Sequence, residues 1–285
     1  MPEGSRKYAV INAVENVPFF RLVADALTRT CGMHRLDAMQ AAKDRPFIFH
    51  THCPQHQAQA LERALSQQGV AAVVVPVEYF TRLSQAHPLA NADCLPGCFE
   101  AQPPAGKTLK IEWRDIAMIA YGSVEHRERK TRGTVGSPDA AGPGLGAVLN
   151  TYVGPNPGAL AGMGVPRRVR PKLDISDKER VGVHDCLDVF IGYLKDDEFA
   201  GHFRVLADSF YYDYLGDRIQ PTSDANFRLF VSDIVHYATG AMLTDKTRRF
   251  LAGMPAGKPI KGFPLFDEYN RWSVAIARAR ADGAA

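Results

Sequence analysis

The first 76 residues of the chain alternate between two spacings of apolar side chains. Three short runs rich in β-branched and aromatic residues have the composition of strands. Between these runs, apolar residues recur every three or four positions, which is typical of one face of a helix. Strands are therefore expected at Tyr8–Val14, Phe47–Thr51 and Val70–Val75, and helices from Phe19 up to Gly32, over His34–Lys43 and over Gln55–Gln68.

Glycine and proline mark the ends of these predicted helices. Gly32 and Gly69 follow the first and third helix, where glycine adopts the left-handed conformation at low cost. Pro54 suits the first turn of the third helix, because its missing N–H is not needed there. In the second helix, Leu36 and Met39 are expected to face inward.

The rest of the chain reads as strands with one closing helix. Residues Thr81–Lys107 contain several prolines and glycines and predict a loop-like connection. Lys130–Pro171 is rich in both residues, has few aromatic residues and predicts a long surface insertion. Strands are expected at Leu109–Trp113, Ile116–Tyr121 (ended by Gly122), His184–Tyr193, His202–Leu206 and Phe210–Leu215, with helices over Pro221–Ala238 and Asp267–Ala281.

These elements predict an α+β protein. A small β-α-α-β-α-β module is followed by a mostly β, pleckstrin-like barrel closed by a C-terminal helix. The predicted boundaries are 1–80 for the module, 81–106 for a Pro/Gly linker, 107–252 for the β domain with a flexible insertion at 130–175, and 253–285 for a C-terminal loop and short helix.

Two parts of the chain resemble known families. The helix end at Cys31-Gly32-Met33, the run Arg35–Met39 and the helix Gln55–Gln68 before Gly69 resemble the C-terminal domain of the bacterial ribosomal stalk protein and the similarly folded Clp protease adaptor. The start Trp113-Arg114-Asp115-Ile116, with a glycine after the next strand, resembles a bacterial pleckstrin-homology-like domain. Both resemblances imply folds that mostly bind other molecules, and function must be argued from the site.

Composition and charge exclude several classes of protein. The 285 residues are 46% hydrophobic and 23% charged, with a net charge of only +3. Nucleic-acid binders usually concentrate far more positive charge, so we do not expect a nucleic-acid partner. No apolar run reaches the roughly 18 residues that a membrane span requires. The absence of a signal-peptide pattern and the odd count of five cysteines favour a cytoplasmic protein with reduced thiols.

The densest set of potential metal ligands is His50, His52, Cys53 and His56. His50 and His52 are expected on one face of a strand, because side chains alternate with period 2. Imidazole and thiolate ligands suit zinc. The alternative interpretation is a strand end with solvated histidines and Cys53 as a small buried residue. The spacing matches no standard zinc finger.

No catalytic constellation stands out, so the sequence favours a non-catalytic cytoplasmic interaction or adaptor protein with a protein partner or self-association. The alternative is a metal-binding protein or metal-dependent enzyme that uses the histidine cluster. A third hypothesis is weak nucleic-acid association through the basic cluster at 167–172. The candidate interaction residues are Tyr211, Tyr212, Tyr214, Trp272, Arg167, Arg168 and Arg170.

Overall fold

The computed structural model describes residues 6–104, 106–131, 177–193, 197–255 and 257–283. The chain divides into two units, residues 1–126 with 181–285, and residues 127–180. Helices and strands both occur throughout the first unit, so the predicted α+β class is confirmed. Most of the predicted insertion at 130–175 lies outside the described residues.

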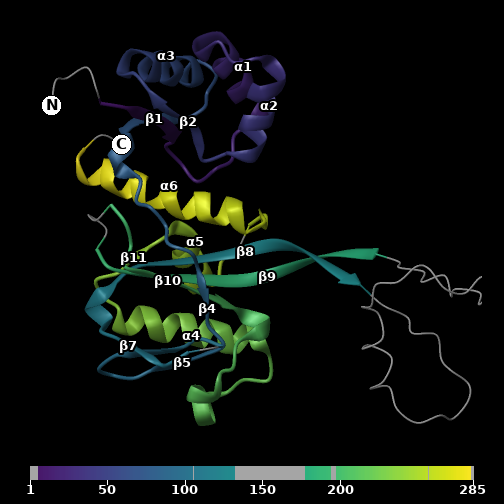
Figure 1. Cartoon of the computed structure of the whole chain (residues 1–285), viewed down its shortest axis with the longest axis vertical. Coiled ribbons are helices and arrows are strands. Elements are labelled where there is room, and N and C mark those ends of the chain that lie inside the picture. The colour runs from purple at the N-terminus through teal and green to yellow at the C-terminus, as the bar shows by residue number, and fades with distance from the viewer. Residues whose placement is uncertain (1–5, 105, 132–176, 194–196, 256, 284–285) are drawn as a thin grey trace, which may run out of the picture. The chain divides into compact units, whose positions relative to one another are not determined.

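The N-terminal sheet has three strands in the order β2-β1-β3, and both neighbours of β1 are antiparallel to it. Three helices cover one face of this sheet (Figure 1). Apolar side chains of the three helices pack with this face of the sheet into a core of their own. The elements are β1 (Tyr8–Asn12), α1 (Phe20–Cys31), α2 (Arg35–Asp44), β2 (Ile48–Cys53), α3 (Gln55–Ser66) and β3 (Ala72–Pro76).

The helix ends follow the glycine signals, but one helix face differs from expectation. Gly32 and Gly69 adopt φ values of 65° and 75°, the left-handed conformation expected of them. Leu36 is 68% exposed, so the expectation that it faces inward is wrong. Ala38 and Ala42 are buried instead, because α2 lies close against α1 and only small side chains fit between them.

A six-stranded central sheet follows the N-terminal sheet. Its order is β11-β8-β9-β10-β4, with β12 also pairing with β8. Strands β9 and β10 are antiparallel, whereas β4, β11 and β12 join their neighbours in parallel. The strands are β4 (His87–Pro88), β8 (Ile116–Thr131), β9 (Asp177–Ile191), β10 (Gly201–Leu206), β11 (Met242–Leu243) and β12 (Ile260–Lys261).

The residues expected to form a linker include the three short strands β4, β5 and β6. Strands β5 and β6 belong to a small antiparallel sheet in the order β5-β6-β7, which packs with α4 on one face of the central sheet. The described strands thus form open sheets, and no closed barrel is found among them. The elements are β5 (Asn91–Cys94), β6 (Phe99–Gln102), β7 (Leu109–Ile111), α4 (Ser223–Tyr237) and α5 (Asp245–Leu251).

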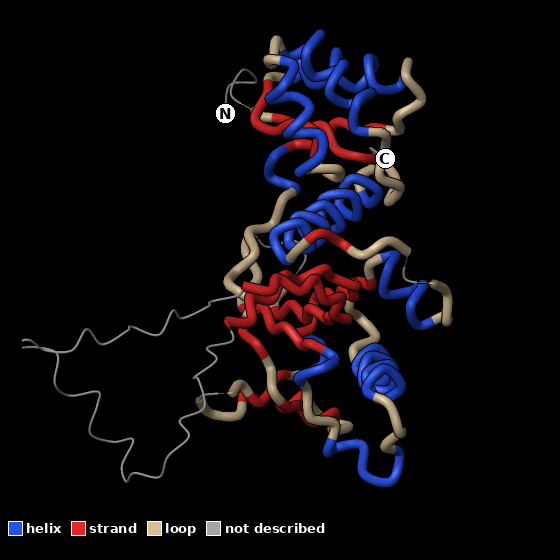
Figure 2. Tube along the Cα trace, turned by 90° about the vertical axis from the view of Figure 1, so that its right-hand side faces the viewer, coloured by secondary structure: helices blue, strands red, loops and turns tan. Residues whose placement is uncertain are grey.

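The C-terminal helix α6 (Phe263–Ala281) lies between the N-terminal sheet and the central sheet (Figures 1 and 2). Residues from all three elements form one continuous core. Gly122 was expected to end a strand, but it lies inside β8. A Cβ atom added at Gly122 would be 2.5 Å from the ring of Phe266 on α6. The missing side chain lets α6 approach the sheet closely.

Candidate functional site

Helix α6 is buried on two opposite sides. Trp272 and Phe266 are almost completely inaccessible, and so are the polar residues Asn270 and Ser273. A helix that covered a single sheet would expose one polar face. The two sheets therefore enclose α6, and its remaining exposed face is available to line a surface site.

Two side chains of α6 face the N-terminal sheet. The indole Nε1–H of Trp272 donates to the carbonyl oxygen of Asn12 over 2.7 Å, which satisfies a backbone group of β1. Glu268 lies near the start of β2, where the backbone N–H groups of Phe47 and Ile48 favour its ionised form.

Glu268 is partly buried in this contact, and its charge is costly there. Burial raises the pKa of the Glu268 carboxyl to about 7, although the two backbone N–H groups and the nearby Arg45 and Arg271 favour its ionised form. Its Oε1 atom is buried without a hydrogen-bond partner. A carboxyl group in this state changes charge close to neutral pH.

A buried polar network fixes the other side of α6 to the central sheet. Asp188 of β9 accepts two hydrogen bonds from Arg204 of β10, at 2.7 and 2.6 Å, and one from Asn270 of α6 at 2.8 Å. His202 Nε2 lies 3.0 Å from Asp188 Oδ2, within ion-pair range but outside hydrogen-bond geometry. Burial by itself would raise the pKa of Asp188, but Arg204 and His202 outweigh it and lower the pKa.

This network holds the helix in place and has no features of a reaction centre. The Cys186 thiol lies 3.8 Å from Asp188, but it is completely buried, and burial raises its pKa well above the ordinary value. A thiol in that state is a poor nucleophile. At the solvent side, Arg204 also donates to Asp267 over 2.7 Å, which links the network to the molecular surface.

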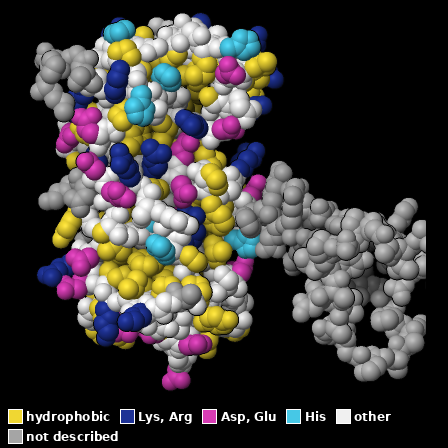
Figure 3. All heavy atoms as spheres, in the orientation of Figure 1, with side chains coloured by type: hydrophobic (Ala, Val, Ile, Leu, Met, Phe, Trp, Pro, Cys, Tyr) yellow, Lys and Arg dark blue, Asp and Glu magenta, His cyan; other side chains and the backbone are white. Residues whose placement is uncertain are grey.

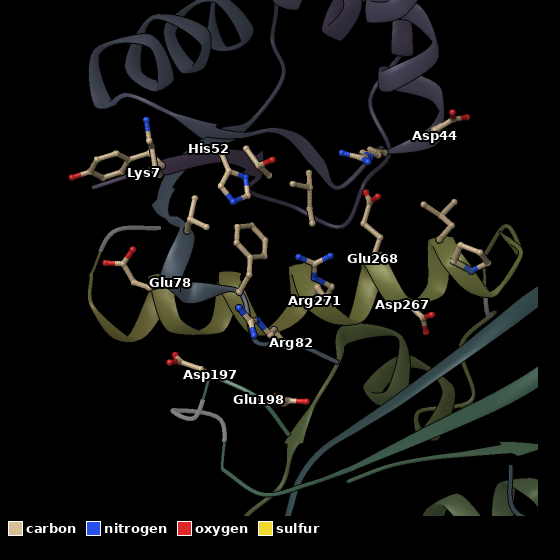
Figure 4. Close-up of a pocket in the computed structure, with 18 of the residues that line it drawn as sticks. Lys7, Asp44, His52, Glu78, Arg82, Asp197, Glu198, Asp267, Glu268 and Arg271 are labelled. Atoms are coloured by element: carbon tan, nitrogen blue, oxygen red, sulfur yellow. The ribbon is translucent and has the colours of Figure 1, made fainter. Parts of the chain in front are cut away.

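A wide groove runs across the exposed face of α6, with a volume of about 1920 Å³ (Figure 3). Its floor consists of residues from the first half of α6. The upper bank comes from the N-terminal module and the lower bank from the segment after β3 together with a turn at 197–198 (Figure 4). Its lining includes Arg6, Lys7, Tyr8, Lys43, Asp44, Arg45, Ile48, Thr51, His52, Gln55, Val77, Glu78, Phe80, Arg82, Asp197, Glu198, Lys261, Pro264, Leu265, Asp267, Glu268 and Arg271.

The two banks of the groove carry opposite charge. The upper bank has four basic residues and one acidic residue, whereas the lower bank has three acidic residues and one basic residue. One ion pair, between Arg6 and Glu78, joins the banks at one end. The charged residues of the banks are Arg6, Lys7, Lys43, Arg45 and Asp44 above, and Glu78, Asp197, Glu198 and Arg82 below. The floor adds Asp267, Glu268 and Arg271, and the exposed Lys261 of β12 also lines the groove.

The structure separates the four predicted metal ligands. His50 pairs with Val10 and is not among the described lining residues of the groove, whereas His52 is one of them. Register shifts occur along β2, and His52 has a φ of 60°, so strict alternation of side chains does not hold along this strand. The Cys53 thiol is buried and donates to the carbonyl oxygen of Tyr8 over 3.4 Å.

Among the residues that the structure describes, no three His, Cys, Asp or Glu side chains form a group that could hold a metal ion. Burial lowers the pKa of His50 and raises that of Cys53. A low histidine pKa leaves the imidazole neutral, as a ligand must be, but a high thiol pKa disfavours the thiolate that zinc binds. His56 is exposed in the first turn of α3.

The predicted aromatic interaction residues differ in their exposure. Tyr211 is 65% exposed, whereas Tyr212 is buried and donates to the carbonyl oxygen of Ala207. Tyr214 is partly buried and donates to Asp233. The expected strand at 210–215 is instead an irregular segment entering a 3₁₀ helix at Asp213–Arg218, because the aromatic side chains pack against α4 rather than into a sheet.

Two further predictions of interaction residues have different outcomes. Trp272 is 2% exposed and belongs to the core between the sheets, so it is not a surface contact residue. Arg167, Arg168 and Arg170 lie outside the described residues.

Several residues that shape the site carried little signal in the sequence. Asp188 and Arg204 stand among strand residues with an ordinary mixture of apolar and polar neighbours. Glu268 lies near the beginning of a predicted helix, and its charged neighbours are typical of a solvated helix face. Only the helix–sheet contacts, which are distant in sequence, show that these charges are buried or line a groove.

No family model, curated protein or solved structure matches this chain. None of the helices in the described part of the chain is long and apolar enough to cross a membrane.

Proposed function

We propose that this protein is a non-catalytic adaptor or assembly protein that binds a polypeptide segment of a partner in the groove over α6. The observation that carries the proposal is the groove itself, with its two banks of opposite charge. Its size also favours a polypeptide, because its volume of about 1920 Å³ exceeds the roughly 300–1,000 Å³ of small-molecule sites.

The mixture of charges argues against a polyanionic ligand. Nucleic acids are bound mainly through neutralisation of their phosphates by basic side chains. A phosphate backbone in this groove would meet Asp197 and Glu198 on the lower bank and Asp267 on the floor. A polypeptide can carry both signs of charge and can complement both banks.

The chemistry of the lining supports binding over catalysis. The described lining residues include no serine or cysteine nucleophile. One carboxylate on the floor already has a protein partner, since Asp267 accepts a hydrogen bond from Arg204.

The metal-dependent alternative has weaker support. His52 is the only one of the four predicted ligands in the described groove lining, and the Cys53 thiol faces the N-terminal core. The stalk-like and adaptor-like interpretation of residues 1–80 remains part of the proposal, since it also implies a binding module.

The proposal is tested by selecting peptides from a displayed random library on the full-length protein. Selected peptides should bind the wild type, and the variant Asp197→Lys/Glu198→Lys should bind them about tenfold more weakly. An exposed ion pair contributes about 0.2–1 kcal/mol, and reversing two charges changes the energy of two such pairs from attraction to repulsion.

The matched control is Asp25→Lys/Asp217→Lys, which makes the same change in net charge at two exposed positions outside the groove lining. It should bind the peptides like the wild type. Failure to select any peptide, or equal binding by the groove variant, would contradict the proposed function.

A further inference from the structure

The charges of the groove are sorted by position, and this sorting restricts what can bind. On the upper bank, Lys7, Lys43 and Arg45 are exposed. On the lower bank, the exposed acidic residues Asp197 and Glu198 lie across α6 from Lys7, together with the exposed Arg82 (Figure 4). A ligand that complements both banks must present acidic groups toward one side and basic groups toward the other.

The upper bank also includes part of an edge strand. β2 has β1 as a neighbour on one side and occupies the end of the strand order in the N-terminal sheet. Ile48, Thr51 and His52 of this strand line the groove. Edge strands present backbone N–H and C=O groups that an extended segment can use, whereas a helical segment has already used its own backbone groups.

We infer that the bound segment is extended and carries alternating acidic and basic side chains. This inference rests on the proposed function and names the class of polypeptide that the groove selects. In an extended chain, consecutive side chains point to opposite sides. Acidic residues at every second position then face the basic upper bank, and the basic residues between them face the acidic lower bank.

The apolar lining residues fit the same arrangement. Tyr8 and Ile48 lie on the upper bank, Phe80 on the lower bank, and Pro264 and Leu265 at the beginning of the floor. Long charged side chains such as lysine and glutamate pack their methylene groups on apolar surface and keep their charged ends near opposite charges. The groove thus offers contacts to both parts of such side chains.

The test compares fluorescein-labelled eight-residue peptides of identical composition by fluorescence anisotropy with the full-length protein. One peptide alternates four glutamates with four lysines, one carries the same residues as two blocks, and one places the two charges on opposite faces of a helix. The alternating peptide should bind at least tenfold more tightly than the other two. Its affinity should fall as salt rises from 0.02 to about 0.2 M, because screening weakens exposed charge pairs.

Variants locate the binding and separate the two claims. Asp197→Lys/Glu198→Lys should weaken the alternating peptide about tenfold, and Asp25→Lys/Asp217→Lys should leave its affinity unchanged. The inference is overturned if the block peptide or the helical peptide binds as tightly as the alternating peptide, or more tightly. If Asp197→Lys/Glu198→Lys then abolishes the binding of that peptide, the proposed function still stands. Failure of the alternating peptide to bind also overturns the inference, and a library that yields no binder contradicts the proposed function as well.

Discussion

Glu268 connects the first half of α6 to the start of strand β2, and its ionisation should make the stability of the protein depend on pH. Burial raises the pKa of the carboxyl to about 7, although the backbone N–H groups of Phe47 and Ile48 favour the ionised form. The charged groups that influence it are Arg45, which precedes β2, and Arg271 on its own helix. The substitution Glu268→Gln keeps the shape of the side chain and removes the titration.

The sign follows from the two pKa values. The folded protein holds the Glu268 proton up to about pH 7, whereas the unfolded chain releases it near 4.5. The folded state therefore binds more protons between these values, so its stability falls as the pH rises from about 4.5 to about 7. Each pKa unit is worth about 1.4 kcal/mol, which sets an upper limit of about 3 kcal/mol. Glu268 is partly exposed, and solvent screening reduces the expected effect to about 1–2 kcal/mol.

The assay is urea denaturation of the wild type and Glu268→Gln at pH 5, 6, 7 and 8, followed by tryptophan fluorescence. Between pH 5 and 8 the wild type should lose about 1–2 kcal/mol more of its unfolding free energy than the variant. All other ionisable groups are common to both proteins, so their contributions cancel in the comparison. Parallel pH profiles would refute the reasoning, because they would show that Glu268 has the same pKa in the folded and unfolded states.

Three further predictions concern the core and the metal question. Asp188→Asn should cost about 3–5 kcal/mol in urea denaturation, since it leaves the mostly buried Arg204 with the partly exposed Asp267 as its remaining carboxylate partner. A cost below 1 kcal/mol would contradict the role of the network. Gly122→Ala should lower the unfolding free energy by about 1–3 kcal/mol in the same assay, because the new methyl group would overlap the buried Phe266 ring, and an unchanged midpoint would show that α6 does not approach β8 so closely. The protein purified with added zinc should hold far less than one equivalent of zinc by elemental analysis, because no three potential ligands gather among the described residues. One equivalent of bound zinc that is lost in the variant Cys53→Ser would favour the metal-binding alternative.

The local elements of the N-terminal module were predictable because each carries its own signal. The left-handed glycines Gly32 and Gly69 and the alternating strand and helix spacings depend on residues close in sequence. The inward position of Leu36 was wrong because the close packing of α2 on α1 selected alanines. Register shifts likewise interrupt the strict alternation of side chains along β2, and periodicity contains no signal for such a bulge.

The groove itself depends on contacts between distant residues. The alternation of Leu187 and Val189 predicted one apolar face on β9, but Cys186 and Phe190 are also buried, because α6 covers the second face. Nothing in the spacing of α6 shows that it lies between two sheets. The floor and banks of the groove follow from that placement, so a sequence pattern could predict the helix but not the site.

The central claim is that an extended polypeptide binds in the groove over α6. Hydrogen–deuterium exchange of the full-length protein, with and without the alternating peptide at saturation, tests it most directly. The account predicts slower exchange at β2 and at the turn that contains Asp197 and Glu198, with α1 and α4 unchanged. Slower exchange confined to α1, α4 or other elements outside the groove would contradict it.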